Sequence, residues 1–126
     1  SIVIGEGGSG GALAISVADK LAMMRYSVYA VISPEGCSAI LWNDPTKVET
    51  AANALKITAE NLKELNLIDD VINEPLIGAH RQKELAILAL KEYFLNSLDE
   101  LKRLTPSQRY EKKYQKIMNL GSFLER

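Results

Sequence analysis

The sequence predicts an α/β protein, because its first third twice places a β-type run directly before a helical one. Residues 2–4 are a β-branched run typical of a buried strand, and small apolar residues from 12 onward are typical of a closely packed helix. Residues 26–32 alternate and are rich in β-branched and aromatic side chains, which favours a second strand. A helix start follows directly, at Ser33.

A glycine loop, residues 5–11, joins the first strand to the first helix and holds five of the chain's eight glycines. Glycine has no Cβ, so it tolerates positive φ and lets a ligand approach the backbone closely. The first turn of a helix adds unpaired N–H donors and a partial positive charge. The loop is therefore predicted to hold an anion, or an oxygen that becomes one. The alternative is a turn where strand and helix pack too closely for side chains.

Helix-end signals place the elements between residues 12 and 72. Helices are expected over residues 12–22, 34–42, 46–54 and 58–65, with short strands over residues 67–72 and, as an option, 21–24. Ser33 and Thr58 are typical N-caps. Thr46 fits a capping box with Glu49. Asn66 is expected in the left-handed conformation that often follows a helix.

The last third of the chain is predicted to be helical. After a linker at residues 75–80, a long amphipathic helix is expected over residues 82–104, and a second over residues 106–120 ending at Gly121. Spacings of three and four residues predict one apolar stripe on the long helix, buried either against the core of the domain or against a partner subunit. This stripe is Ile87, Leu90, Phe94, Leu98 and Leu101.

Length and charge narrow the classes of function. With 126 residues and a net charge of -1, the chain suits one ordinary domain and has no overall nucleic-acid footprint. Lys and Arg gather after His80, which indicates either a solvated helix face or an interaction surface. No apolar run is long enough to span a membrane, and no signal peptide is recognisable, so a cytosolic or organelle-interior protein is expected.

Several catalytic and metal-binding chemistries are poorly supported. Cys37 and His80 are the only residues of their kinds, so neither a disulfide nor a cysteine-based zinc cluster can form within the chain. No metal site is expected, because the acidic residues are scattered without a histidine at ligand spacing. Gly5, Gly7 and Gly10 satisfy the dinucleotide fingerprint, but no acidic residue follows at the required distance.

Five segments carry a resemblance to a known family. They read IGEGGSGGALA at 4–14, SVYAVISPEGC at 27–37, SAILW at 38–42, ALKITA at 54–59 and LIDDVINEPLIGAH at 67–80. On these segments the chain resembles the alpha subunit of the multi-subunit, bacterial and plastid type of acetyl-CoA carboxylase carboxyltransferase. The specific motifs extend from residue 2 to about residue 81, and a looser resemblance continues through the C-terminal helices.

The resemblance implies a crotonase-like fold, in which stacked ββα units form a spiral. Residues 1–80 are then expected to be the C-terminal part of a crotonase-like carboxyltransferase domain, and residues 81–126 a helical extension. Residue 1 lies at or inside a strand, so the chain is expected to be a C-terminal piece of a longer polypeptide.

The implied activity is transfer of a carboxyl group from carboxybiotin, supplied by a carrier protein, to acetyl-CoA. The product, malonyl-CoA, is the first committed intermediate of fatty-acid synthesis, and the carboxylase as a whole is an ATP-dependent complex. The family assembles as α2β2 with the active site between subunits, and the beta subunit carries a zinc ribbon. The implied location is the cytoplasm or the plastid stroma.

The resemblance also suggests roles for the glycine loop. Backbone N–H groups of Gly10 and Gly11, with that of Ala12, are expected to donate to the ureido oxygen of biotin. The pair Gly7-Gly8 is the alternative donor set.

Pro34, Glu35 and Gly36 begin the second helix and are expected to border the biotin pocket, although Glu35 could equally complement the helix dipole. A different class of function also fits the sequence. In it the chain is a non-catalytic crotonase-like assembly module whose basic C-terminal helices form the interface.

Overall fold

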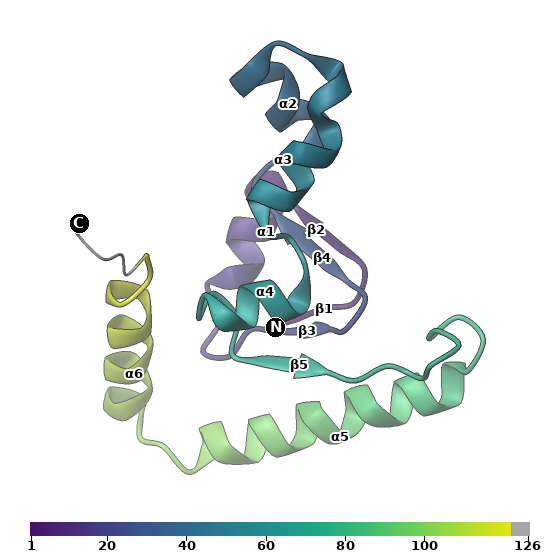
Figure 1. Ribbon diagram of the computed structural model, residues 1–126. Helices are drawn as coiled ribbons and strands as arrows, with labels where there is room; N and C mark the ends of the chain where they lie inside the picture. Colours follow the sequence, from purple (N-terminus) through teal and green to yellow (C-terminus); the bar gives the residue numbers. More distant parts are fainter. Residues whose placement is uncertain (122–126) are drawn as a thin grey trace.

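Two small parallel sheets form the centre of the computed structural model, which describes residues 1–121 (Figure 1). One sheet has three strands in the order β1-β3-β5, and the other pairs β2 with β4. The strands are β1 (Ile2–Val3), β2 (Glu6–Gly8), β3 (Ala22–Met24), β4 (Val28–Ala30) and β5 (Asp70–Ile72). These pairings are all parallel, so the predicted α/β class is confirmed.

The strands are distributed between the sheets in a repeating way. β1 and then β2 precede the helix α1 (Ser9–Ser16), and β3 and then β4 precede the helix α2 (Pro34–Trp42). In each pair the first strand joins the three-stranded sheet and the second joins the two-stranded sheet. The chain therefore repeats a ββα unit, which brings the end of β2 beside the end of β4.

The core lies between the three-stranded sheet and the helix α4 (Ala59–Glu64). β3 is buried along its whole length, as expected for the middle strand of a parallel sheet covered on both faces. Its neighbours in the core come from four other parts of the chain. The core cluster is Val3, Leu21, Met23, Ala59, Leu62 and Ile68.

The first helix ends earlier than predicted, at Ser16, and the last residue of its expected range, Ala22, begins the strand β3. A helix over 12–22 is wrong beyond Ser16, because Ala22 pairs in register with Ile2 of β1 and with Asp70 of β5. Burial of Met23 and Met24 between two strands outweighs their helix propensity. The optional strand at 21–24 is thus confirmed for residues 22–24.

Local end signals correctly placed α2. The Gly36 N–H donates to Ser33 Oγ at 3.1 Å, which makes Ser33 the N-cap as predicted. Asn43 ends the helix in the left-handed conformation. In Figure 1, α2 packs on α3 (Val48–Leu55), and the two extend away from the sheets.

The cap predicted at Thr46 is wrong. Residues Pro45–Lys47 form a short 3-10 helix ahead of α3, and Asp44 caps it by accepting the Thr46 N–H at 2.9 Å. The Asp44 carboxylate accepts hydrogen bonds from both the Thr46 N–H and the Thr46 hydroxyl, so the Thr46 side chain donates instead of capping the helix. Thr58 does occupy the N-cap position of α4, without a side-chain cap hydrogen bond, and Asn66 has the predicted positive φ, 56°.

Two helices complete the described chain, α5 (Lys83–Lys102) and α6 (Pro106–Met118). Figure 1 shows α5 running alongside β5 and α6 turning away at its far end. The Tyr93 hydroxyl donates to Asp70 Oδ2 at 2.8 Å and so ties α5 to β5. Thr105 forms a complete capping box with Gln108 at the start of α6.

The predicted apolar stripe on α5 is not buried within the described residues. Ile87 is 61% exposed and Phe94 is 55% exposed, while Ala86 is buried. The face toward β5 instead follows Ala86 and Tyr93, with Leu90, Leu98 and Leu101 only half-buried. Because α5 carries leucines on several faces, its periodicity could not select the face that packs.

Candidate functional site

The glycine loop forms the sharp connection between β2 and α1. Gly8 ends β2 and is the N-cap of α1, so Gly10 and Gly11 lie in the first helical turn. N–H groups in that turn have no partner within the helix. Ala12 is one position further along, where the N–H ordinarily bonds the N-cap carbonyl. The N–H groups of Gly10 and Gly11 are therefore available to a ligand, whereas the position of Ala12 commits its N–H to the helix.

Positive φ occurs in this loop at Ser9 and not at the glycines. Ser9 has φ of 56°, whereas the structure gives none of the five loop glycines a positive φ. The expectation that these glycines supply a left-handed backbone is therefore wrong. The turn into α1 is made by a residue with a side chain, at a cost of about 1–2 kcal/mol.

Close packing explains only one of the loop glycines. A Cβ built on Gly7 would lie 2.8 Å from Cδ2 of Tyr29 and 3.4 Å from Cγ1 of Val3. A Cβ on Gly10 or Gly11 would meet no atom of the described residues within 4 Å. The tight-turn interpretation therefore fits Gly7, while Gly10 and Gly11 leave open space above the backbone.

Tyr29 fixes the start of α1 against β4. Its ring packs over Gly7, and its hydroxyl donates to the carbonyl of Ala12 at 2.7 Å. The sequence analysis placed Tyr29 in a strand but gave it no role in the site. Only the pairing of Gly7 with Tyr29 in the β2–β4 register reveals that role.

Two cavities flank the loop and share Ala30. A smaller cavity of about 270 Å³ is lined by Ser9, Gly10, Ala12, Leu13, Tyr29, Ala30 and Val31. Its wall is mainly apolar.

The larger cavity, of about 530 Å³, has Gly7, Gly8, Pro34 and Glu35 among its lining residues. The structure thus brings Pro34 and Glu35 beside Gly7 and Gly8, and their place at a biotin pocket stays a prediction. Gly36 lines neither cavity, since its N–H serves the Ser33 cap and a Cβ there would lie 2.9 Å from Ile32 Cγ1.

The groups at the loop suit stabilisation of a negative oxygen. The smaller cavity is lined by Gly10 and the Ser9 hydroxyl and by no carboxylate, whereas Glu6, Glu35 and the Ser33 hydroxyl line the larger one; neither cavity is lined by His80 or Cys37. Within residues 1–121, no cluster of three or more His, Cys, Asp or Glu side chains is placed to hold a metal ion. None of the helices described here is both long and apolar enough to cross a membrane.

Comparison with known proteins gives one family match over nearly the whole chain. Residues 1–121 match the model of the family described as acetyl co-enzyme A carboxylase carboxyltransferase-like.

Curated relatives are similar over the full chain but are longer than it. The chain is 90% identical over 123 residues to the acetyl-coenzyme A carboxylase carboxyl transferase subunit alpha of Aliarcobacter butzleri, covering 98% of this chain and 40% of that protein. It is 69% identical over 125 residues to the subunit of the same name from Nitratiruptor sp., covering 99% and 40%. It is also 63% identical over 123 residues to the subunit of the same name from Helicobacter hepaticus, covering 98% of this chain and 39% of that protein. The chain therefore spans about 40% of the length of these relatives.

Proposed function

The chain belongs to the acetyl co-enzyme A carboxylase carboxyltransferase-like family, and from this premise we propose that it forms the biotin-facing part of a carboxyltransferase. The proposed reaction moves a carboxyl group from carboxybiotin on a carrier protein to acetyl-CoA, giving malonyl-CoA for fatty-acid synthesis. Because the chain spans about 40% of its relatives, the activity is assigned to the longer polypeptide in its assembly. The family match favours neither the dinucleotide-binding nor the non-catalytic interpretation.

The proposal rests on the open helix start at Gly10 and Gly11. Carboxybiotin supplies the carboxyl group, and negative charge grows on its ureido oxygen as that group leaves. The N–H groups of Gly10 and Gly11 donate to this oxygen from fixed positions, and one such donor is worth about 3 kcal/mol of barrier. No residue in the described chain occupies the space that a Cβ would take at either glycine, which leaves room for a ring to approach.

Packing and the smaller cavity support the choice of Gly10, and Gly11, which lines neither cavity, is included because its N–H lies in the same first turn of α1. Gly7 and Gly8 belong to the β2–β4 pairing, and Gly7 is needed for packing against Tyr29. The smaller cavity offers an apolar wall beside Gly10 for a fused ring system. Pro34 and Glu35 border the adjoining space, and Gly36 contributes by allowing α2 to start against Ile32.

The proposed fold is a partial crotonase-like spiral over residues 1–80 with a helical extension from residue 81, of which residues 122–126 lie outside the described residues. The repeated ββα unit, with its two strands in different sheets, supports this assignment. The extension begins just before α5, which has a contact to β5 through Tyr93.

The proposed partners are a zinc-bearing beta subunit in an α2β2 assembly and a biotin carboxyl carrier protein. The relatives' name, subunit alpha, supports a complex with other subunits. Exposed apolar side chains on α5, such as Ile87 and Phe94, are the proposed contact face. The proposed location is the cytoplasm, or the stroma in a plastid relative.

Reconstitution of carboxyl transfer tests this function. The full-length subunit, mixed with the beta subunit, is expected to form malonyl-CoA from acetyl-CoA and carboxybiotin. Either subunit alone is expected to be inactive, because the site is proposed to lie between them. Failure of the assembled pair to transfer the carboxyl group, or robust transfer by the full-length alpha subunit alone, would contradict the proposal.

A further inference from the structure

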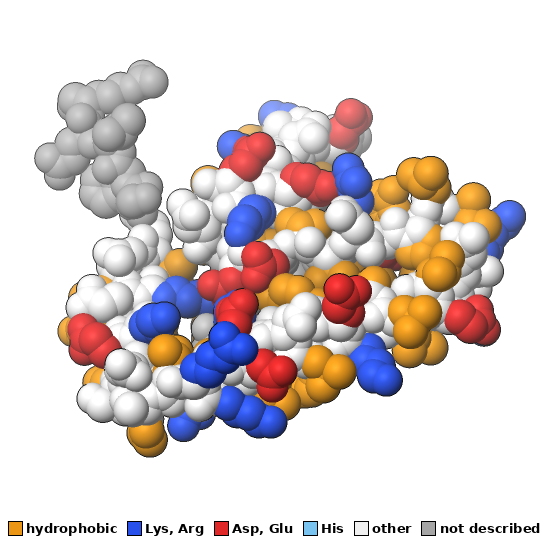
Figure 2. All heavy atoms as spheres, turned by 90° about the horizontal axis from the view of Figure 1, so that it is seen from below, with side chains coloured by type: hydrophobic (Ala, Val, Ile, Leu, Met, Phe, Trp, Pro, Cys, Tyr) orange, Lys and Arg blue, Asp and Glu red, His pale blue; other side chains and the backbone are white. Residues whose placement is uncertain are grey.

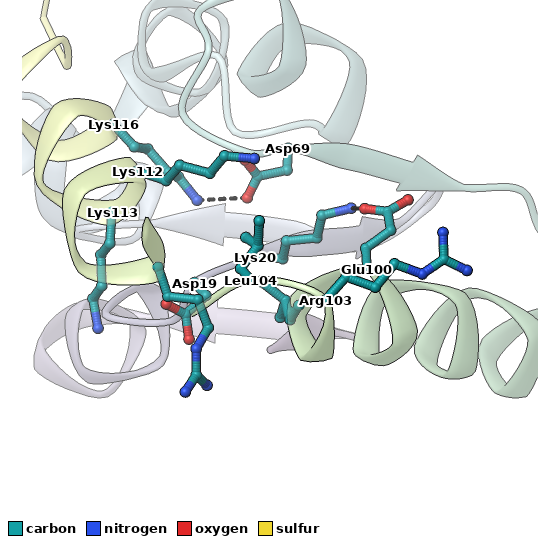
Figure 3. Close-up of a pocket in the computed structure, with 11 residues that line it drawn as sticks. Asp19, Lys20, Asp69, Glu100, Arg103, Leu104, Lys112, Lys113 and Lys116 are labelled. Carbon is teal, nitrogen blue, oxygen red and sulfur yellow. Dashed lines mark hydrogen bonds and ion pairs between the residues drawn. The ribbon is translucent and has the colours of Figure 1, made fainter. Parts of the chain in front are cut away.

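A cavity separate from the glycine loop lies where α5 meets α6 (Figure 3). Its volume is about 550 Å³. The walls come from the loop after α1, the residue before β5, the end of α5 and one face of α6. None of its lining residues borders the two cavities of the glycine loop.

Positive charge dominates the cavity. Its cationic lining residues are Lys20, Arg103, Arg109, Lys112, Lys113 and Lys116. Three carboxylates oppose them, those of Asp19, Asp69 and Glu100. Figure 2 shows Lys and Arg side chains in blue, with Asp and Glu in red among them, on the part of the surface where α5 and α6 meet. The local basic character of the C-terminal third is thus concentrated at one hollow of the surface.

Three of the cations are engaged in holding the helices in place. Lys116 pairs with Asp69 at 2.5 Å, and Lys20 pairs with Glu100. Lys113 donates to the carbonyl of Val17 at 2.9 Å. Two of the three carboxylates are therefore already neutralised by these pairs.

The other three cations are uncommitted within the part of the chain that the structure describes. Arg103, Arg109 and Lys112 form neither an ion pair nor a side-chain hydrogen bond there. In Figure 3, Lys112 extends from α6 on the same side as Lys116, toward Asp69. Asp69 also accepts the Leu21 N–H at 2.6 Å, so its carboxylate already accepts from two donors, Lys116 and the Leu21 backbone.

We propose that this cavity binds an organic phosphate, with Arg109 and Lys112 contacting the phosphoryl oxygens. A planar guanidinium matches phosphate geometry with paired hydrogen bonds, and a lysine ammonium adds a point charge. Leu101 and Leu104 give the cavity an apolar wall for the organic part of the ligand. The volume lies within the range of small-molecule sites.

Two sources of such phosphates fit this chemistry: the phosphorylated end of a coenzyme A ligand, and a free nucleotide. Both present several phosphoryl oxygens beside a ring system. The proposal concerns the cavity alone and holds whether or not the glycine loop takes part in carboxyl transfer.

Calorimetric titration of the full-length protein in its assembly tests the proposal, with no biotin or acyl group present. The probes are adenosine 3′,5′-bisphosphate, ATP and inorganic pyrophosphate. The double variant Arg109→Gln, Lys112→Gln is expected to bind the preferred probe at least about tenfold more weakly, since hydrogen bonds to charged groups are removed. The matched control is Lys91→Gln with Lys102→Gln, two exposed lysines of α5 outside the cavity, and it is expected to bind as the wild type does.

The pattern of probe binding distinguishes the sources. Preference for the bisphosphate indicates a coenzyme A ligand, and preference for ATP indicates a free nucleotide. Raising the salt from about 0.05 M to 0.5 M is expected to weaken binding, because it screens exposed charges. Absence of binding by all three probes would overturn the proposal, as would binding that the double variant leaves unchanged.

Discussion

Glycines in the loop between β2 and α1 serve two different physical purposes. Gly7 has no room for a side chain, because the ring of Tyr29 lies over it and the Tyr29 hydroxyl is held by the Ala12 carbonyl. A Cβ at Gly10 or Gly11 would meet no described atom within 4 Å, and both residues lie in the first turn of α1, where N–H groups have no partner within the helix. One glycine thus shapes the site, and the other two leave it accessible.

Replacing Gly7 tests whether the contact with Tyr29 requires a glycine at this position. Gly7→Ala is expected to lower the free energy of unfolding of the full-length subunit by about 1–3 kcal/mol, because the new methyl group overpacks against Tyr29. Gly5→Ala is the matched control, since a Cβ at Gly5 meets nothing within 4 Å, and its effect is expected to stay within about 0.5 kcal/mol. Urea denaturation of both variants measures the difference. Equal stabilities would show that the Tyr29 contact does not require a glycine.

Residue-scale prediction from sequence succeeded where the cause is local. The cap at Ser33 and the left-handed Asn66 depend on neighbours a few positions away, and both were predicted correctly. The positive φ at Ser9 was not predicted, because the glycine-rich sequence suggested that a glycine would take it. The role of Tyr29 was missed as well, since it depends on a strand pairing between residues 22 positions apart.

At the scale of elements, α5 is attached to β5 by a side-chain hydrogen bond, and its far end is held by the Lys20–Glu100 pair. Tyr93 donates to Asp70 at the edge of the three-stranded sheet, where few other side chains of α5 are well buried. Burial raises the pKa of the Tyr93 hydroxyl well above its usual value, and the hydrogen bond to Asp70 adds to the increase. Neutral Tyr93 is therefore the form that the folded protein favours.

This raised pKa predicts a loss of stability at alkaline pH. The contribution of Tyr93 is complete below the unfolded-state pKa of about 10 and declines as pH rises above it, because unfolding then releases a proton that folding retains. Tyr93→Phe is expected to cost about 1 kcal/mol at pH 7 and to make stability less sensitive to pH above 10.

Urea denaturation between about pH 8 and pH 11 measures the effect of Tyr93→Phe. Tyr26→Phe, at an exposed tyrosine, is the control and is expected to keep the wild-type pH dependence. If Tyr93→Phe and the wild type lost stability in parallel as pH rose, the docking role of this hydroxyl would be refuted.

Prediction at the element scale failed where tertiary contacts outweigh local preference. The first helix was predicted to continue to residue 22, yet it ends at Ser16 and Ala22 pairs between β1 and β5. Within the described residues, α5 buries Ala86 and contacts β5 through Tyr93, whereas Ile87 and Phe94 are exposed, so burial of their stripe against a partner subunit stays a prediction. Periodicity identifies a helix but does not say which of several apolar faces meets a neighbour.

The described chain combines two ββα repeats with a helical extension, and Lys and Arg side chains gather where the helices α5 and α6 of this extension meet. The repeats place Gly8 opposite Ala30 in the β2–β4 pairing, so the N-cap of α1 and the start of α2 line the same larger cavity. The sequence predicted the glycines and the residues at 34–36 separately, and the family resemblance linked them to one pocket. The concentration of charge between α5 and α6 required the fold, since its residues lie in four separate parts of the chain.

The central claim is that the N–H groups at Gly10 and Gly11 stabilise the oxygen of the leaving biotin. Gly11→Val in the full-length assembled enzyme tests it most directly, because its side chain would fill the space that the ring must enter, while this chain offers no clash to disturb folding. Gly5→Val is the matched control, at another open glycine outside the helix start. The measurement is kcat for malonyl-CoA formation, with the mass of the complex confirming assembly. The account predicts a loss of about 100-fold or more for Gly11→Val and a near wild-type rate for the control. An assembled Gly11→Val enzyme working at a near wild-type rate would contradict it.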